Sequence, residues 1–285
     1  MFCYVFGVCV VRFVYVCPVG TSLLQNFVRD PRWGSVVERF KEFRVESWFR
    51  LSPDDPLNIV PDGYICSVVR GHELFNALLN YLRSNPKEAC AEVNGIYGIR
   101  DLFGHSPRDV EVLLYHSRTC NSRLCGSVLE DFLRGEGYLV ESIEVRALRS
   151  VDDFELGLIE VLDKIVRLVV RKKSEGLKVY VNATPGFKSE VTFLVIASIL
   201  AGADGVVYIH ESFRSPVLLP IPPLTLNTKV VSDVLELFKD ISCLDTYYVN
   251  SRLGSELVTN MLDLGVLRLE EGRVCIREWV KHLPL

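Results

Sequence analysis

The stretch Val179–Glu190, which reads Val-Tyr-Val-Asn-Ala-Thr-Pro-Gly-Phe-Lys-Ser-Glu, carries the residues best suited to chemistry. It predicts a short buried strand over 179–181, a turn at Pro185-Gly186 and a helix from about Lys188. The first N–H groups of such a helix have no internal partners, and the helix dipole favours negative charge there. Because Lys188 adds a positive charge at the same point, the stretch is typical of a phosphate site. A plain strand-to-helix turn with an exposed lysine is the alternative interpretation.

A second turn of this kind lies near the N-terminus. The apolar stretch Val8–Cys17 predicts a strand, and it runs directly into Pro18-Val-Gly-Thr-Ser-Leu-Leu24. Gly20 permits the backbone to turn, and the hydroxyl of Thr21 or Ser22 can cap a helix over 23–29. Considered alone, this turn is equally well explained as an ordinary capped helix start.

Strands and helices alternate along most of the chain. Strands are predicted at 8–17, 111–117, 138–145, 179–181 and 206–210, and helices at 23–29, 33–49, 72–82, 86–95, 123–134, 153–173 and 188–201. This order predicts an α/β fold with a Rossmann-like, doubly wound and mainly parallel sheet. The 188–201 helix is apolar on nearly every face, so we expect it to be deeply packed. Ligands bind such sheets outside the carboxyl ends of the strands, where the loops 18–22, 117–122 and 182–188 all lie.

A proline-rich stretch, Leu219-Pro-Ile-Pro-Pro223, divides the chain into residues 1–222 and residues 223–285. The second part predicts helices followed by a two-stranded hairpin over 266–269 and 273–276, which is the order of a winged helix. From 225 to 285 it holds seven Lys and Arg against nine Asp and Glu, a net charge of −2. Since a DNA-binding face should be basic, we interpret this domain as a dimerisation module or a lid, and DNA binding is disfavoured.

Composition places further limits on the function. The 285 residues are 49% hydrophobic with a net charge of −4, which suits one large core with a smaller domain and argues against a general nucleic-acid binder. The apolar N-terminal run ends at Arg12, too short to span a membrane, so we expect a cytoplasmic protein without a membrane partner. The nine cysteines are odd in number and form no Cys-x-x-Cys pair, which indicates reduced cysteines used as small hydrophobic residues.

Several other motifs carry little weight. The sequence has no Gly-x-Gly-x-x-Gly, no Walker A motif and no cluster with metal-ligand spacing, so we expect neither a cofactor nor a metal. The stretches 100–105 and 277–282 match the Arg-x-x-x-x-His pattern of HEPN-type ribonucleases, but no helical bundle surrounds either one, which favours coincidence. His116 ends a predicted strand, and we interpret it as a structural histidine in preference to a catalytic base.

Four stretches carry a resemblance to a known family: Gly20-Thr-Ser-Leu-Leu24, Ala91-Glu-Val-Asn94, Leu113-Leu-Tyr-His-Ser-Arg-Thr119 with Gly126, and Asn182-Ala-Thr-Pro-Gly-Phe-Lys188. Together they resemble the CARF family, the CRISPR-associated Rossmann-fold sensors of cyclic oligoadenylates. The resemblance covers most of residues 8–211. Because a HEPN domain is lacking and a winged helix is predicted, the chain resembles the ring nuclease type. It departs from many members at Pro185-Gly186, where they have Gly-Gly, and proline makes the turn stiffer.

The resemblance implies a homodimer that binds cyclic tetra-adenylate and cleaves it without metal to linear di-adenylate with a 2′,3′-cyclic phosphate, switching off type III CRISPR signalling. It implies catalytic roles for Lys188 and Ser22. The ligand-binding residues that it implies are Gly20, Thr21, Ser117, Arg118, Thr119, Asn182, Thr184, Gly186 and Phe187. Two alternatives stay open: a non-cleaving sensor that regulates transcription, and a sensor that acts on a partner effector or cleaves linear RNA.

Overall fold

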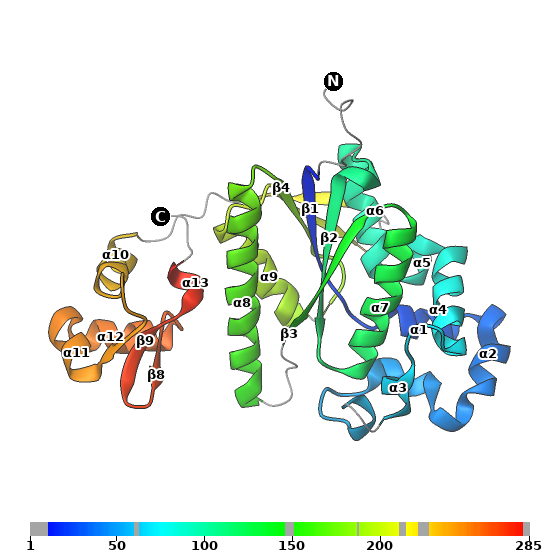
Figure 1. The fold of residues 1–285 in the computed structure, drawn as a ribbon, viewed down its shortest axis with the longest axis horizontal. Helices are drawn as coiled ribbons and strands as arrows, with labels where there is room; N and C mark the ends of the chain where they lie inside the picture. The colour runs from blue at the N-terminus through cyan, green and yellow to red at the C-terminus, as the bar shows by residue number, and fades with distance from the viewer. Residues whose placement is uncertain are drawn as a thin grey trace.

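The computed structural model describes residues 11–59, 63–145, 151–186, 188–210, 215–221 and 228–281. Its centre is a six-stranded sheet in the order β3-β2-β1-β4-β5-β6 (Figure 1). The strands are β1 (Phe13–Pro18), β2 (Val110–Ser117), β3 (Leu139–Val145), β4 (Lys178–Asn182), β5 (Gly205–Ile209) and β6 (Pro216–Leu219). Strand β6 pairs antiparallel with β5, and the other neighbours are parallel. The predicted α/β fold with a doubly wound, mainly parallel sheet of Rossmann type is confirmed.

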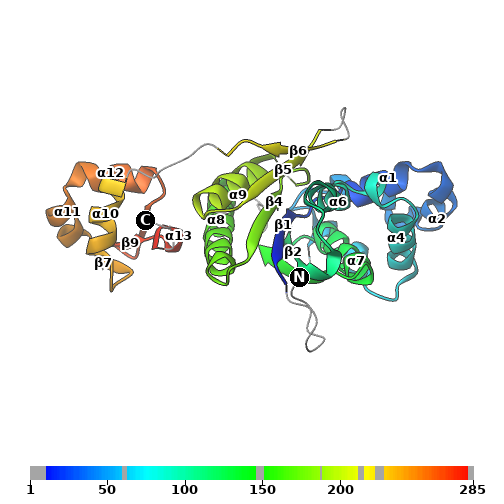
Figure 2. The same cartoon turned by 90° about the horizontal axis from the view of Figure 1, so that it is seen from above.

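Helices cover both faces of this sheet. They are α1 (Ser22–Arg29), α2 (Gly34–Arg39), α3 (Tyr64–Ser67), α4 (Glu73–Ser84), α5 (Pro86–Ala89), α6 (Ala91–Phe103), α7 (Cys120–Gly135), α8 (Val151–Ser174) and α9 (Lys188–Leu200). Figure 2 shows α8 and α9 on one face, and α6 and α7 with α1 and α4 on the other. The central strands are therefore buried on both sides, which explains their nearly continuous apolar sequences.

The strands that follow β1 are added first on one side of it, as β2 and β3, and then on its other side, as β4, β5 and β6. This strand pairs with β2 on one side and β4 on the other, with Val16 opposite Leu113 and Val181. The carboxyl ends of β1 and β4 therefore lie side by side at the topological switch point, where doubly wound sheets bind their ligands.

The predicted single helix over 33–49 is wrong. The structure has α2 followed by the short 3-10 helices η2 (Lys41–Phe43) and η3 (Val45–Arg50), with Arg44 in the left-handed region at a φ of 57°. Phe40 and Val45 are both buried. On a continuous helix these two side chains would point about 140° apart, so the chain has to break to bring both to the core.

Helix α9 is less deeply packed than its sequence predicts. Leu194 and Ala197 are buried, but Phe193 and Ile196 are 38% and 42% exposed. The predicted single helix over 86–95 is wrong as well, because the extended backbone of Cys90 divides it into α5 and α6, and α6 continues to Phe103. Strand β6 is absent from the sequence-based expectation because it is short and begins with a proline, which an edge strand tolerates.

The C-terminal part contains the predicted helices and hairpin. Its elements are α10 (Thr228–Leu237), β7 (Cys243–Asp245), α11 (Thr246–Leu253), α12 (Ser255–Asp263), β8 (Leu267–Glu270), β9 (Arg273–Ile276) and α13 (Glu278–Lys281). The three strands form a second sheet in the order β7-β9-β8. This part is held against α8, where the Trp279 N–H donates to the Asp163 carboxylate at 2.6 Å. The winged-helix assignment stays a prediction, and the expected boundary at 222/223 lies outside the described residues.

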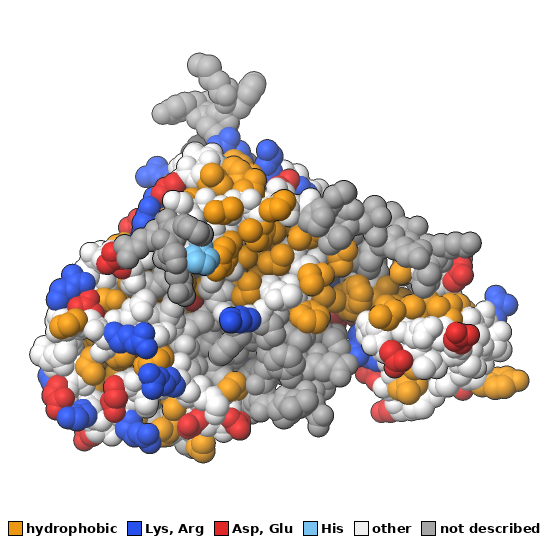
Figure 3. All heavy atoms as spheres, turned by 180° about the vertical axis from the view of Figure 1, so that it is seen from behind, with side chains coloured by type: hydrophobic (Ala, Val, Ile, Leu, Met, Phe, Trp, Pro, Cys, Tyr) orange, Lys and Arg blue, Asp and Glu red, His pale blue; other side chains and the backbone are white. Residues whose placement is uncertain are grey.

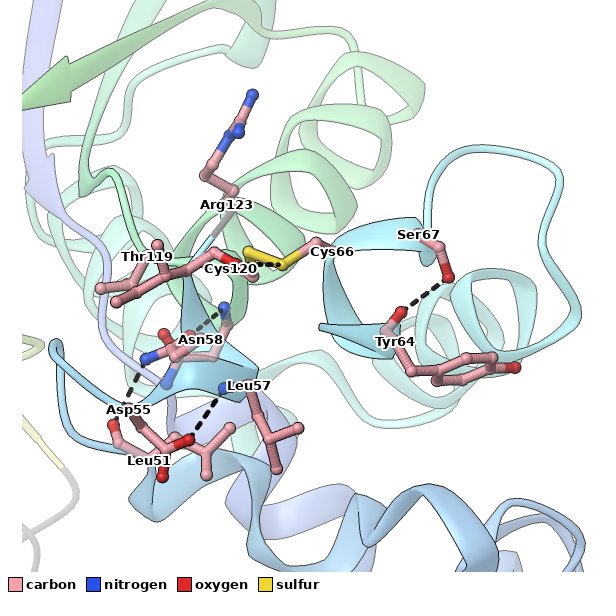
Figure 4. The surroundings of a disulfide bond; sticks show 12 residues. Leu51, Asp55, Leu57, Asn58, Tyr64, Cys66, Ser67, Thr119, Cys120 and Arg123 are labelled. Carbon is pink, nitrogen blue, oxygen red and sulfur yellow. Dashed lines mark hydrogen bonds between the residues drawn. A yellow bond between two sulfur atoms is a disulfide. The ribbon is translucent and has the colours of Figure 1, made fainter. Parts of the chain in front are cut away.

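Two disulfides overturn the expectation that the cysteines are reduced. Cys66 of α3 is bonded to Cys120 of α7 (Figure 4), and Cys243 is bonded to Cys275 in the C-terminal sheet. The paired residues are 54 and 32 positions apart, so their proximity arises from the fold and has no local sequence signal. The buried thiols of Cys17, Cys90 and Cys125 are free, as small hydrophobic residues would be.

The N-terminal strand is shorter in the described structure than the predicted 8–17. Strand β1 begins at Phe13, and residues 1–10 lie outside the described part of the chain. Of the helices that the structure describes, none has both the length and the apolar character needed to cross a membrane.

Replacing Gly95 with alanine tests the packing of α6 against β4. A Cβ atom at this position would overlap the buried Asn182 amide. We expect Gly95→Ala to lower the free energy of unfolding by about 1–3 kcal/mol, as overpacked cores do. Urea denaturation measures the change. Gly34→Ala is the matched control, because its Cβ meets nothing within 4 Å on α2. An unchanged midpoint for Gly95→Ala would contradict this packing.

Candidate functional site

A cavity of about 230 Å³ lies at the topological switch point. Its wall is formed by the β1–α1 turn, the start of α6 and the β4–α9 turn. The lining residues are Gly20, Thr21, Ser22, Gln25, Ala91, Glu92, Thr184, Pro185 and Gly186. The fold thus brings together two of the three predicted loops, 18–22 and 182–188.

Two glycines allow these turns to approach each other closely. A Cβ atom on Gly20 would lie 3.5 Å from the backbone nitrogen of Gly186. Gly186 has a φ of 100°, and a Cβ there would lie 3.1 Å from the Pro18 Cβ. A side chain at 186 would therefore be strained and would push the turn away from β1.

Two helices begin in the cavity wall, α1 at Ser22 and α6 at Ala91, and α9 begins at Lys188, two residues after the lining residue Gly186. The predicted hydroxyl cap of α1 is wrong, because Thr21 is the N-cap residue but makes no side-chain cap bond. Its hydroxyl donates instead to the Phe49 carbonyl at 3.1 Å. Each helix start carries about half a positive charge, so their convergence favours an anion.

Ser22 is held by two hydrogen bonds. Its Oγ donates to Oε2 of Glu92 at 2.8 Å and accepts from the Ala91 N–H at 3.1 Å. The other Glu92 oxygen accepts from the Gly20 N–H at 2.7 Å. Glu92 is 1% exposed, so a buried carboxyl group fixes both Ser22 and the preceding turn.

The predicted ligand-binding residues of the β4–α9 turn have different positions. Asn182 is fully buried, and its amide donates to the Cys17 sulfur at 3.3 Å and the Glu92 carbonyl at 3.1 Å. Thr184 lines the cavity, and its hydroxyl accepts from the Ile209 N–H at 3.0 Å. Asn182 therefore holds the turn from beneath, while Thr184 and Gly186 face the cavity.

The predicted contacts in the 117–122 loop lie outside the cavity lining. Ser117 and Thr119 share a hydrogen bond of 2.7 Å between their hydroxyl oxygens, and Arg118 forms an ion pair with Glu144 of β3 at 3.1 Å. This loop reaches the first turn through Ser122, whose hydroxyl donates to the Val19 carbonyl at 3.3 Å. The ligand roles of Ser117, Arg118 and Thr119 stay predictions.

Lys188 is exposed at the start of α9, two residues after Gly186, which lines the cavity. Lys188 is not among the residues that line the cavity, and its catalytic role stays a prediction. Phe187, a predicted ligand-binding residue, lies outside the described residues.

The histidines belong to structural contacts. His116 bonds to the Ser117 carbonyl at 3.0 Å and the Ser142 hydroxyl at 2.9 Å, and burial lowers its pKa, which keeps the ring neutral. His105 stacks on Phe13 at 3.6 Å between ring centroids. Because Phe13 begins β1, this Arg-x-x-x-x-His motif lies at the edge opposite the cavity. His282 of the second motif is outside the described residues.

One group in the described structure has metal-ligand geometry, formed by Cys243, Glu270 and Cys275 of the C-terminal sheet. Its two cysteines are bonded to each other, so their sulfurs are not available as thiolate ligands.

Sequence reasoning missed Glu92 as a functional residue. The signal was present, because Glu92, Ile96 and Ile99 recur at the i, i+4 and i+7 spacing of one helix face. An acidic residue on an otherwise apolar face is unusual, and it indicates a specific partner.

The fold and the cavity define an α/β protein with a candidate binding site at the switch point of its sheet. Residues 87–222 match a family described as CRISPR-associated protein (Cas_APE2256). The match covers less than half of the 285 residues, so it shows a similarity of this region to a CRISPR-associated family. The matched region includes Glu92 and the β4–α9 turn, whereas Ser22 precedes it.

The Cys66–Cys120 disulfide lies beside the 117–122 loop, and Figure 4 shows it joining the two helix segments. We expect the double variant Cys66→Ser/Cys120→Ser to lose roughly 4 kcal/mol of unfolding free energy, because the bond closes a long loop. Guanidinium denaturation measures the loss. As a control, a reducing agent should destabilise the wild type more than the double variant, in which only the Cys243–Cys275 bond is left to reduce. Equal stability of the oxidised wild type and the variant would contradict the expectation.

Proposed function

We propose that the protein is a CRISPR ring nuclease with a CARF sensor domain. It binds cyclic tetra-adenylate as a homodimer and cleaves it without metal to linear di-adenylate ending in a 2′,3′-cyclic phosphate. The reaction would switch off type III CRISPR signalling. One observation carries the proposal: the β1–α1 turn, the start of α6 and the β4–α9 turn, which leads to Lys188, line one cavity in a chain that resembles a CRISPR-associated family over residues 87–222.

The residues present suit this chemistry. A ribonucleotide carries its own nucleophile, the 2′-hydroxyl, so the protein has to align this oxygen with the scissile phosphate. Negative charge that develops on the phosphorane would meet Lys188 and the first N–H groups of α9. Ser22 lies across the same cavity and would contact the ribose or the phosphate.

The cavity size supports a site shared between two subunits. Its volume of about 230 Å³ is below the 300–1,000 Å³ typical of a complete small-molecule pocket. A cyclic tetra-adenylate ring has four equivalent phosphates, so a two-fold dimer would present one cavity to each half of the ring.

Exposed apolar residues offer surfaces for a second copy. Helix α9 starts at the cavity and exposes Phe193 and Ile196, which share a face because they are three residues apart. Seen from behind, hydrophobic side chains also gather near the β6 edge of the sheet, where Val217 and Leu218 are exposed (Figure 3). We assign the dimer contact to α9, because a partner there would place both cavities near the two-fold axis.

Cleavage of the ring is the first test. We expect purified protein to convert cyclic tetra-adenylate in EDTA to linear di-adenylate, followed by chromatography. Lys188→Ala should slow cleavage by about 10²–10³-fold while the ring still binds, since one donor to the phosphorane is lost. Lys239→Ala is the matched control, an exposed lysine of the C-terminal part that should leave the rate unchanged.

Other outcomes would redirect the function. Tight binding of a ring that stays intact would refute the nuclease and support the non-cleaving sensor. Degradation of linear RNA only in the presence of the ring would support the effector alternative.

The dimer has its own test. Phe193→Glu/Ile196→Glu places two charges on the exposed face of α9, where burial in an interface would be costly. We expect this variant to be monomeric by light scattering and to lose most ring binding. Leu264→Glu, at a residue that is 69% exposed in the C-terminal part, should stay dimeric. A dimeric double variant would show that α9 is not the interface.

A further inference from the structure

Glu92 has an unusual position for an acidic residue. It lies at the second residue of α6, is 1% exposed, and still lines the cavity. Both of its carboxyl oxygens accept hydrogen bonds, one from the Gly20 N–H and one from the Ser22 hydroxyl. A carboxyl group that accepts at both oxygens is acting as a carboxylate.

These contacts determine what Ser22 can do. A hydroxyl group has one donor and two acceptor positions. The Ser22 proton is directed to Glu92, and one acceptor position is used by the Ala91 N–H. The remaining position on Oγ is an acceptor. Ser22 can therefore receive a proton from a substrate hydroxyl, and it has no proton left to donate to a phosphate.

Two helix starts and three buried thiols lie around Glu92. The starts of α1 and α6 both lie against Glu92, and their dipoles stabilise a negative charge. The other titratable groups facing it are the thiols of Cys17 on β1, Cys90 at the N-cap of α6 and Cys125 on α7. Burial, and then the Glu92 charge, raises the pKa of each thiol, so all three stay protonated.

We propose that Glu92 positions the Ser22 hydroxyl and receives, through it, the proton of the 2′-hydroxyl that attacks the scissile phosphate. The inference rests on the proposed ring nuclease function and adds a proton acceptor to it. Glu92 is a positioning residue, since Ser22 stands between it and the ribose.

The step balances as follows. The 2′-oxygen forms a bond to phosphorus while the bond between phosphorus and the 5′-oxygen breaks. The 2′-hydroxyl proton passes to Ser22 Oγ as the Ser22 proton passes to Glu92 Oε2. The leaving 5′-oxygen takes a proton from water, and the hydroxide that results recovers the proton from Glu92 through Ser22. No oxidant, metal or other reactant is consumed.

The experiment uses the full-length protein with cyclic tetra-adenylate under single-turnover conditions in EDTA, from acid to alkaline pH. The variants are Glu92→Gln, which keeps the side-chain shape, and Ser22→Ala, which cuts the relay. Glu88→Gln is the matched control, an exposed glutamate four residues earlier. Ring binding and urea denaturation are measured for every protein.

In the wild type we expect cleavage to slow as the pH falls, because the attacking 2′-hydroxyl needs a proton acceptor. Glu92→Gln should bind the ring at least as tightly, cleave about 10²–10⁴-fold more slowly, and lose this acid dependence. Ser22→Ala should lose the same acid dependence. Glu88→Gln should match the wild type in both rate and pH profile.

Three results would overturn the relay. One is a Glu92→Gln rate within threefold of the wild type. Another is a slow Glu92→Gln variant that keeps the wild-type pH profile and binds the ring weakly, which indicates a purely structural role. Should Glu92→Gln fail to fold, an unchanged acid dependence in Ser22→Ala would refute the relay. A wild type that does not cleave the ring would instead refute the nuclease and the relay together.

Discussion

The parallel pairing of β1 with β4 is the constraint on which the rest of the structure depends. Cys17 and Asn182, which meet across it, are 165 residues apart, and the Asn182 amide extends the contact to the Glu92 carbonyl of α6. Three segments distant in sequence are thereby held at one edge of the sheet. Gly95 leaves room for the Asn182 side chain, because the Cβ atom of any larger residue at position 95 would overlap its amide. Without this pairing, the β1–α1 turn and the β4–α9 turn would be two unrelated loops.

Glu92 places a carboxylate beside the proposed anion site, where two negative charges would repel each other. Burial of the carboxylate, with local groups that compensate its charge, reduces this repulsion. Burial of a charge costs several kcal/mol unless hydrogen bonds and dipoles compensate for it. Glu92 has two such bonds and two helix starts, all on the inner side of the cavity. Lys188, at the start of α9, is exposed. In the proposed reaction the buried carboxylate would accept a proton, and the exposed lysine would meet the negative charge of a phosphate.

Much of the fold followed from the sequence, because buried parallel strands are continuously apolar and the helices between them have clear starts. The two glycine-containing turns were identified from local patterns, and the fold does bring them together. Glu92 was not assigned a role, since its partners Gly20 and Ser22 are about seventy residues away in sequence and only the tertiary structure shows the contact. The disulfides escaped prediction for the same reason. The break between Phe40 and Val45 escaped it because propensity alone indicates one helix there, and tertiary packing overrides that preference.

In the proposed site, the groups that would bind the phosphate differ from those that would select the base. Backbone N–H groups and helix starts recognise phosphate without regard to the base attached to it, so they position a nucleotide but do not identify it. Recognition of the base in the proposed ligand would need side chains further out, and the neighbouring 117–122 loop is held in place by contacts with other segments. Asn121 donates from its backbone N–H to Asn58 and from its amide to the Trp48 carbonyl, at 2.9 and 3.1 Å. The Cys66–Cys120 bond fixes the same loop from the other side. Both Asn58 and Trp48 lie outside the region 87–222 that resembles the CRISPR-associated family, so the contacts that hold this loop depend on a part of the chain that the match does not cover.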